Sequence, residues 1–179
     1  MTMRPGGFVL VVGPSGAGKD TLIRLARAAL ADEPRFVFPR RLVTRPPSAH
    51  EDNDEIGEAA FAEGEASGRF ALSWHAHGLG YALPRETVAL AQAGQVVVVN
   101  ISRRIVAEAR ARLPRVSVVA VTAPPAVLAA RLAVRGRPED GDIAARLARQ
   151  APDEADLTIV NDGPPEDGAA RLVAHLRAR

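Results

Sequence analysis

The sequence predicts an α/β fold of three layers, in which helices cover both faces of a parallel sheet. Apolar runs of strand length alternate with stretches whose apolar residues recur at helical spacing, as in parallel sheets with right-handed crossovers. The run Val96–Val99 is wholly β-branched, which is typical of a strand buried on both faces. A glycine-rich loop at residues 13–21 follows the first strand and precedes the first helix, and it organises the rest of the chain.

This loop fits the phosphate-binding pattern G-x-x-x-x-G-K-[ST] except at its last position, where Asp20 replaces Ser or Thr. A strand, a glycine-rich turn and a helix are the context in which backbone N–H groups and the positive helix end hold phosphate oxygens. The alternative is a glycine-rich turn without a ligand. We expect phosphate binding by the whole loop, namely Gly13, Pro14, Ser15, Gly16, Ala17, Gly18, Lys19, Asp20 and Thr21.

Lys19 is the only lysine in the chain, and every other long basic side chain is arginine. Because an ammonium and a guanidinium are not interchangeable, this pattern indicates a function for Lys19 at the outer phosphates. Asp20 adds a negative charge beside those phosphates, which a cation should balance. Asp20 and Thr21 could hold Mg²⁺, or Thr21 could make a polar contact while Asp20 pairs with an arginine.

Composition limits the function classes. A chain of 179 residues predicts a single domain over 1–179, and the lack of cysteine fits the cytoplasm. The sequence pI is about 9.9, but the net charge is only +2 and aromatics make up 4%, so we expect no nucleic-acid partner. No apolar run is long enough to span a membrane, and we do not expect a membrane as a partner. The oligomeric state stays open, with a homodimer as one option.

The remaining elements follow from periodicity and from Gly and Pro positions. Strands are expected at 8–12, 36–43, 70–77, 96–99, 116–122 and 157–160. Helices are expected at 22–30, 58–67, 84–93, 103–112, 126–135, 143–149 and 166–177. Ser102 suits an N-cap, and the acidic stretch 48–57 has the composition of a solvated loop. We divide the domain into a core (1–37, 84–130 and 147–179), an insertion at about 38–83 and a lid at about 131–146.

Ligands of a parallel sheet gather at the carboxyl ends of its strands. Besides the glycine-rich loop, Arg45 and the segment 100–102 follow such ends. Arg131 and Arg135 share a helix face, and Arg137 follows after a glycine. Arginines on a closing flap can neutralise a transferring phosphoryl group, so we expect a catalytic role for these three and for Lys19. The alternative is a helix face of solvated arginines.

Several motifs occur in the order seen in guanylate kinases, over nearly the whole chain. They are Gly13–Thr21, Thr44–Pro47, Trp74 with Tyr81, Arg131–Arg137, Arg146–Leu147 and Ile159–Asp162. The resemblance implies a core sheet, an acceptor-binding insertion and an arginine lid, as in nucleoside monophosphate kinases. The chain departs from guanylate kinases where guanine is bound. Their carboxylates are replaced by Ser73, Asn100 and Ser102, their second acceptor arginine falls near Ser48, and an acceptor tyrosine is missing from 52–56.

The remaining set is similar to the ribose 1,5-bisphosphate phosphokinase family, which shares the guanylate kinase fold. It comprises the loop with aspartate after its lysine, the segment 74–79, and 99–103. The resemblance implies transfer of a phosphoryl group from ATP, with Mg²⁺, to ribose 1,5-bisphosphate in phosphonate breakdown. The product would be 5-phosphoribosyl 1-diphosphate. The alternatives are a nucleoside monophosphate kinase with altered recognition and a non-catalytic guanylate-kinase-like binding module.

A bisphosphorylated sugar carries about four negative charges and has no base, so its site should be rich in arginine and imidazole. Arg41, Arg45 and Arg103 are the candidates for its phosphates, and Tyr81, Asn100 and Ser102 complete the expected acceptor site. His75 and His77 alternate on a predicted strand and should share a face, although one partly buried and one solvent-facing histidine is an equal alternative. An anionic phosphate oxygen needs no general base as nucleophile, and we find no further ligands for a zinc site.

Overall fold

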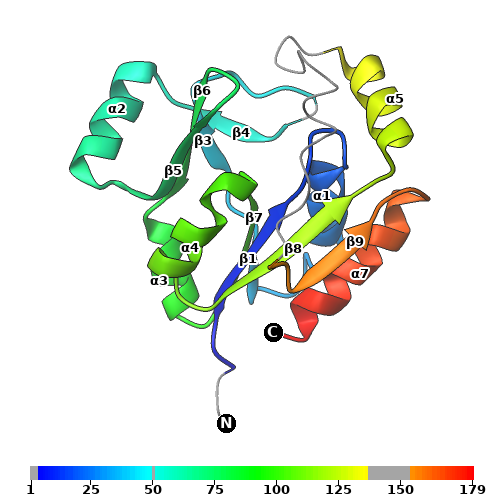
Figure 1. Ribbon diagram of the computed structural model, residues 1–179. Helices are drawn as coiled ribbons and strands as arrows, with labels where there is room; N and C mark the ends of the chain where they lie inside the picture. Colours follow the sequence, from blue (N-terminus) through cyan, green and yellow to red (C-terminus); the bar gives the residue numbers. More distant parts are fainter. Residues whose placement is uncertain (1–3, 50, 137–153) are drawn as a thin grey trace.

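The computed structural model describes residues 4–49, 51–136 and 154–179. A five-stranded parallel sheet in the order β2-β7-β1-β8-β9 forms the core, and a four-stranded sheet in the order β4-β3-β6-β5 lies above it in Figure 1. The first sheet contains β1 (Gly7–Val12), β2 (Phe36–Val37), β7 (Val96–Asn100), β8 (Val116–Thr122) and β9 (Leu157–Val160). The second contains β3 (Arg41–Val43), β4 (Asn53–Glu55), β5 (Phe70–Ala76) and β6 (Leu79–Pro84).

The described helices flank these sheets. They are α1 (Lys19–Ala29), α2 (Glu58–Ser67), α3 (Glu86–Gln92), the 3₁₀ turn η1 (Arg103–Ile105) with α4 (Val106–Arg112), α5 (Pro125–Arg135) and α7 (Pro165–Arg177). Ser102 caps η1, because its Oγ accepts a hydrogen bond from the backbone N–H of Arg104 at 3.3 Å. The helix expected at 143–149 lies outside the described residues.

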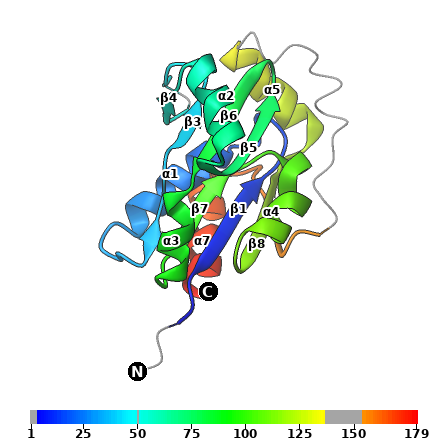
Figure 2. The ribbon, with the colours of Figure 1, turned by 90° about the vertical axis from the view of Figure 1, so that its left-hand side faces the viewer.

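Successive side chains of the central strands point to opposite faces of the sheet, and helices packed on both faces produce the predicted three layers. Val9 and Val11 of β1 point into a core shared with α1 and α7, whereas Phe8, Leu10 and Val12 pack on the other side with α3 and α4. Both faces of the sheet are therefore covered, as parallel sheets require (Figure 2). The α/β class and the helix-flanked parallel sheet are confirmed.

The carboxyl ends of the central strands meet at one edge of the sheet, and the second sheet stands over this edge. Val11 of β1 lies level with Asn100 of β7, and Val12 lies level with Ala120 of β8. The glycine-rich loop after β1 and the segment after β7 are thus neighbours in space, which places their side chains in one site.

Two predicted elements differ in the structure. The strand expected at 36–43 is two strands, β2 and β3, which belong to different sheets and are separated by Phe38, Pro39 and Arg40. The acidic stretch expected as a solvated loop contains β4, which pairs in parallel with β3. Periodicity could not show either feature, because runs of two or three residues are too short to carry it.

Pro84 also differs from its expected role. The sequence predicts it in the first turn of a helix, but it ends β6, where it pairs with Phe70, and the helix begins at Glu86. The register of β5 and β6 shifts beside this pair, between Phe70 and Leu72, and proline is tolerated at such irregularities of a sheet.

Candidate active site

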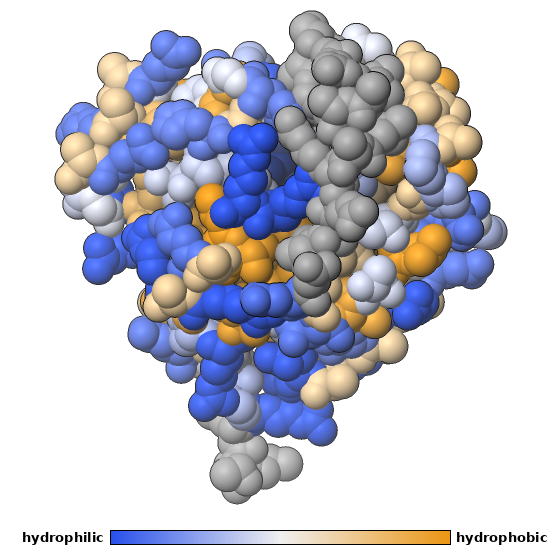
Figure 3. Space-filling model, viewed as in Figure 1, coloured by the Kyte–Doolittle hydropathy of each residue, from blue (hydrophilic) through white to orange (hydrophobic). Residues whose placement is uncertain are grey.

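A pocket of about 480 Å³ opens where the two sheets face each other. On the face seen in Figure 3, strongly hydrophilic side chains gather around the hollow in the upper half of the molecule. Most of the predicted site residues line this pocket, namely Gly13, Pro14, Ser15, Gly16, Gly18, Lys19, Asp20, Thr21, Arg41, Arg45, His77, Tyr81, Asn100, Ser102, Arg103, Arg131 and Arg135. The sequence therefore identified one connected site, although its segments are far apart in the chain.

The glycine-rich loop has the backbone that a phosphate cradle needs. Gly16 and Gly18 have φ angles of 84° and 92°, in the left-handed region that favours glycine. Lys19 folds back over the loop, and its Nζ donates to the carbonyl oxygens of Gly13 at 2.8 Å and Pro14 at 3.3 Å. Burial lowers the pKa of Lys19 to about 8, because the ammonium has lost much of its hydration and Arg41 and Arg135 lie nearby.

Asp20 has a partner that sequence reasoning did not predict. Its Oδ1 accepts a hydrogen bond from the side-chain amide of Asn100 at 2.9 Å. The level pairing of β1 with β7 explains the contact, because it brings the end of β7 beside the first turn of α1. Asn100 thus orients the carboxylate, whose second oxygen could reach a cation in the pocket.

Arg131 lies against the back of the loop. Its guanidinium donates to the carbonyl oxygens of Gly16 at 3.1 Å and Asn161 at 2.7 Å. The amide of Asn161 in turn donates to the carbonyl of Ala17 at 2.8 Å. Ala17 is fully buried, and its small side chain packs into the core rather than lining the pocket.

Arg41 and Arg45 are held by a buried carboxylate. Glu51 pairs with Arg41 through one carboxylate oxygen and with Arg45 through the other, and only 6% of Glu51 is exposed. Sequence reasoning placed Glu51 in a solvated loop, because burial of a charge against two arginines leaves no mark in composition. The short separation in sequence between an arginine-rich strand and an acidic stretch was the only available signal.

Two stacked aromatic rings lie beside Arg41. The rings of Trp74 and Tyr81 stack with centroids 5.5 Å apart and an interplanar angle of 5°, and each residue is 6% exposed. The guanidinium of Arg41 lies over the Tyr81 ring, with its Cζ 5.2 Å from the centroid. These ring faces are engaged within the protein, which leaves them little surface for stacking on a nucleobase.

The two histidines do not share a face, so that prediction is wrong. β5 ends at Ala76, and His77 lies in the following turn with a φ of 55°, where it lines the pocket. His75 is exposed and does not line the pocket; its Nε2 lies 3.3 Å from the Glu65 carboxylate. The break in strand geometry between the two residues explains why simple alternation failed.

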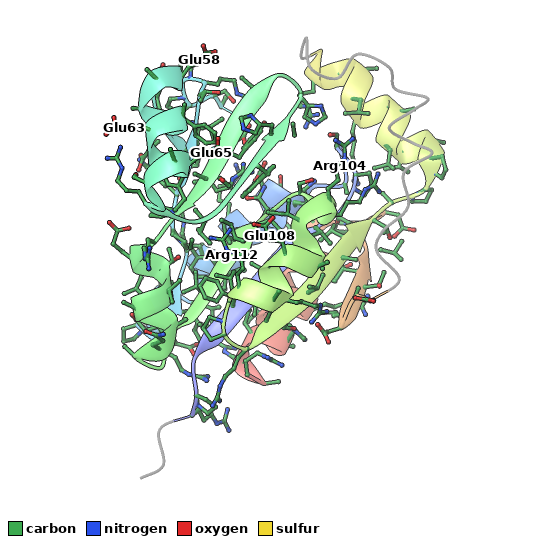
Figure 4. All side chains as sticks on the ribbon, turned by 60° about the vertical axis from the view of Figure 1, so that its left-hand side comes forward. Glu58, Glu63, Glu65, Arg104, Glu108 and Arg112 are labelled. Atoms are coloured by element: carbon green, nitrogen blue, oxygen red, sulfur yellow. The ribbon has the colours of Figure 1, made fainter. Side chains whose placement is uncertain are left out.

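Ser73 also points away from the pocket, toward α2. Its hydroxyl donates to Glu65 at 2.9 Å, and in Figure 4 Glu65 lies on the side of α2 that faces β5, whereas Glu63 points outward. Trp74 and Ala76, at the alternate positions of β5, line the pocket instead. The serine that replaces a guanylate kinase carboxylate is therefore not a pocket residue.

Arginines that sequence reasoning did not select add to the site. Arg24 on α1 and Arg104 at the start of the η1–α4 segment line the pocket, and Figure 4 shows Arg104 at the end of this segment nearest the site. Arg137 lies outside the described residues, as does the part of the proposed lid beyond Gly136.

The charge balance of the pocket is strongly positive. Among the described residues, eight lysine and arginine side chains line it, against two carboxylates, Asp20 and Glu51. The described residues contain no group of three His, Cys, Asp or Glu side chains that could hold a metal by themselves. Beside nucleotides, Mg²⁺ is commonly bound by phosphate oxygens together with one or two carboxylates. Such a pocket suits two polyphosphorylated substrates side by side.

The comparison with known proteins decides the family. The chain is 70% identical over 174 residues to ribose 1,5-bisphosphate phosphokinase PhnN of Methylobacterium radiotolerans, covering 97% of this chain and 99% of that protein. The chain belongs to the ribose 1,5-bisphosphate phosphokinase family. The enzyme of that name from Acidiphilium cryptum is 54% identical, over 98% of this chain and 96% of its own. No family model matches the sequence.

A further relative and a solved structure are also similar to this chain. A bifunctional ribose 1,5-bisphosphokinase-thymidine phosphorylase of Cupriavidus pinatubonensis is 50% identical over 96% of this chain but only 29% of its own length. Guanylate kinase from Anaplasma phagocytophilum superposes with a TM-score of 0.67 at 19% identity, over 98% of this chain and 87% of that one. The guanylate-kinase-like fold is therefore confirmed. Among the described residues, no helix is long and apolar enough to cross a membrane.

Proposed function

We propose that this protein transfers the γ-phosphoryl group of ATP to the 1-phosphate of ribose 1,5-bisphosphate, yielding 5-phosphoribosyl 1-diphosphate and ADP. An oxygen of the 1-phosphate forms the new bond to the γ-phosphorus, and the bond between that phosphorus and the β,γ-bridging oxygen breaks. The attacking oxygen is already anionic, so no side chain has to remove a proton. The residues of the chain act by position and charge.

The observation that carries this proposal is the composition of the acceptor side of the pocket. Arg41 and Arg45 supply paired cations there, and the stacked rings of Trp74 and Tyr81 are occupied by one another. A nucleotide kinase needs polar groups that recognise a base, and the one serine at the corresponding strand position points away toward α2. Paired arginines beside ring faces that are already stacked fit a sugar bisphosphate.

The nucleotide side fits ATP. The glycine-rich loop would hold the β-phosphate, and Lys19 would leave the loop carbonyls to neutralise charge at the β- and γ-phosphates. Asp20 and Thr21 would hold Mg²⁺, which supplies charge neutralisation and orientation for the phosphates. Arg131 and Arg135 would neutralise the transferring group, and His77, Asn100, Ser102 and Arg103 would surround the acceptor.

The test is a comparison of acceptors. Purified protein with ATP and Mg²⁺ should convert ribose 1,5-bisphosphate to a diphosphate that ³¹P NMR detects, with a kcat/KM at least a hundredfold above that for GMP, about 3 kcal/mol of discrimination. Comparable values for the two acceptors would indicate a nucleoside monophosphate kinase. ATP binding without turnover of any acceptor would indicate a binding module.

A further inference from the structure

We infer that Glu51 is a positioning residue for the acceptor: it sets the geometry of Arg41 and Arg45 so that both can bind one phosphate group. The inference rests on the proposed function, because it assigns these arginines to the acceptor. Glu51 was not singled out from the sequence, because it lies in a stretch rich in carboxylates.

The backbone places Glu51 between the two arginines. Arg41 lies level with Asn53 in the parallel pair β3–β4, which brings the residues just before β4 close to β3. Glu51 and Ser48 then form a bridge in which each N–H donates to the other carbonyl, at 3.3 and 3.1 Å. The carboxylate is thereby directed at both guanidiniums rather than at solvent.

The surroundings immobilise the arginine pair from several sides. Arg41 is 7% exposed and lies over the Tyr81 ring, and the side chain of Arg45 is 20% exposed. The amide of Asn53, itself 1% exposed, donates to the carbonyl of Arg45 at 2.9 Å. These contacts form a rigid unit, in contrast to the half-exposed pairs that Asp52 makes with Arg27 and Arg40.

Electrostatics explains why such a unit needs a carboxylate. Two partly buried guanidiniums that face one pocket repel each other, and each loses hydration. One shared carboxylate offsets both effects and leaves the pair with a net positive charge for the substrate. A guanidinium has five N–H donors, so a contact with Glu51 does not exhaust its capacity to bind phosphate.

Removal of the Glu51 charge should weaken acceptor binding, which is opposite to the effect expected from charge alone. If Glu51 were only a negative charge near an anion site, its removal would strengthen acceptor binding. If it positions the arginines, Glu51→Gln should raise the KM for ribose 1,5-bisphosphate at least tenfold and leave the KM for ATP within twofold. The direction of the change therefore separates the two roles.

The experiment compares three variants with the parent enzyme. Asp52→Asn is the matched control: it removes one negative charge at the adjacent position, outside the arginine pair, and should leave both KM values within twofold. Glu51→Asp keeps the charge but is one methylene shorter, so it should show an intermediate rise in acceptor KM. It also carries the test if circular dichroism shows that Glu51→Gln does not fold.

The outcomes are distinct. An unchanged or lowered acceptor KM in folded Glu51→Gln, with or without a drop in melting temperature, would overturn the inference while the proposed function stands. Similar increases in the KM for ATP and the KM for the acceptor would also overturn the inference, because they would indicate a general defect. A parent enzyme that does not turn over ribose 1,5-bisphosphate would reject the proposed function and this inference together.

Discussion

At the scale of single residues, Lys19 combines an unusual position with an unusual environment. It is the only lysine of the chain, and its ammonium rests on the carbonyls of Gly13 and Pro14. This contact holds the side chain over the loop, and the incoming phosphates would be stronger partners than the two carbonyls. A mobile point charge suits such an exchange better than a planar guanidinium does.

The first prediction concerns the loss of this charge. Lys19→Ala should lower kcat at least a hundredfold, which corresponds to about 3 kcal/mol of transition-state stabilisation. The melting temperature should change little, because within the described part of the chain the hydrogen bonds of this side chain go to loop carbonyls. Steady-state kinetics with ATP and ribose 1,5-bisphosphate measures the effect, and near-normal turnover would remove Lys19 from the catalytic residues.

The second prediction concerns protonation of Lys19. Its pKa of about 8 means that a substantial fraction is neutral at pH 8 to 9, and bound phosphates should raise the pKa. ATP binding at this pH should therefore take up a fraction of a proton, and the uptake should vanish at pH 6.5, where Lys19 is already charged. Calorimetry in two buffers with different ionisation heats measures the uptake.

Lys19→Arg provides the control for this measurement, because arginine stays protonated throughout the range. The variant keeps a positive charge at the loop and should show no proton uptake at pH 8.5. Equal uptake by parent and variant would assign the proton to another group and contradict the prediction.

Asp20 is the subject of the third prediction. Asp20→Asn should raise the Mg²⁺ concentration needed for half-maximal rate several-fold, with a smaller effect on acceptor KM, because a carboxylate binds Mg²⁺ better than an amide does. The control is Asp32→Asn, which removes an exposed carboxylate beyond the end of α1. An unchanged Mg²⁺ requirement with weakened acceptor binding would favour a partnership of Asp20 with an arginine.

At the scale of elements, the glycine-rich loop depends on α5 and on the segment after β9. Arg131 and Asn161 bind the carbonyls at Gly16 and Ala17, so the loop is supported from outside as well as by its own turns. Gly18, the N-cap of α1, lies so close to this support that a Cβ would sit 2.4 Å from the Asn161 Nδ2. The element interface therefore requires glycine at this position.

The fourth prediction follows from this approach. Gly18→Ala should lower the free energy of unfolding by at least 1–2 kcal/mol, roughly the cost of a left-handed conformation for an L-residue, and should weaken ATP binding. Gly57→Ala is the control, since Gly57 has a φ of −66° and nothing lies within 4 Å of an added Cβ. Urea unfolding of both variants gives the comparison, and equal stabilities would contradict the prediction.

At the scale of the whole molecule, α7 is joined to the central sheet by a polar contact inside an otherwise apolar layer. Ser117 of β8 is fully buried, and its Oγ lies 2.8 Å from Nε2 of His175 near the end of α7. Burial lowers the pKa of His175, with a further lowering by Arg179 that the nearby Asp156 opposes. The folded protein therefore favours the neutral form of His175 more than the unfolded chain does.

The fifth prediction is the resulting pH dependence of stability. The unfolded chain protonates His175 near pH 6.5 and the folded chain only at lower pH, so the unfolded state binds more protons in this window. Stability should be full above pH 6.5 and should fall as the pH is lowered below it. The urea midpoint of His175→Gln should fall less than that of the parent between pH 7 and pH 5.

His75→Gln serves as the comparison for this measurement, because it removes a histidine from an exposed position on β5. A parent-like pH dependence in His175→Gln would contradict the prediction and assign the acid sensitivity to carboxylates. Asp156 is one such group: burial raises its pKa, but hydrogen bonds from Val118 and Arg110 outweigh burial and lower it.

The fold class, the glycine-rich loop between the first strand and the first helix, and most residues that line the pocket could be predicted from the sequence alone. These properties are local or periodic: the strand–loop–helix order, β-branched runs such as Val96–Val99, and arginines after strand ends. The carboxyl ends of parallel strands meet by geometry, so residues as distant as Lys19 and Asn100 could be assigned to one site from the order of the elements alone.

The contacts between individual groups could not be predicted before the three-dimensional structure was known. Strand register brings Asp20 to Asn100 and Glu51 to its two arginines. The turn at His77 explains why His77 lines the pocket and His75 does not. A shift of one residue would reverse the face of every side chain in a strand, and composition carries no record of register. The residue type is the same for a buried carboxylate and a solvated one, so only the packing around it shows which of the two it is.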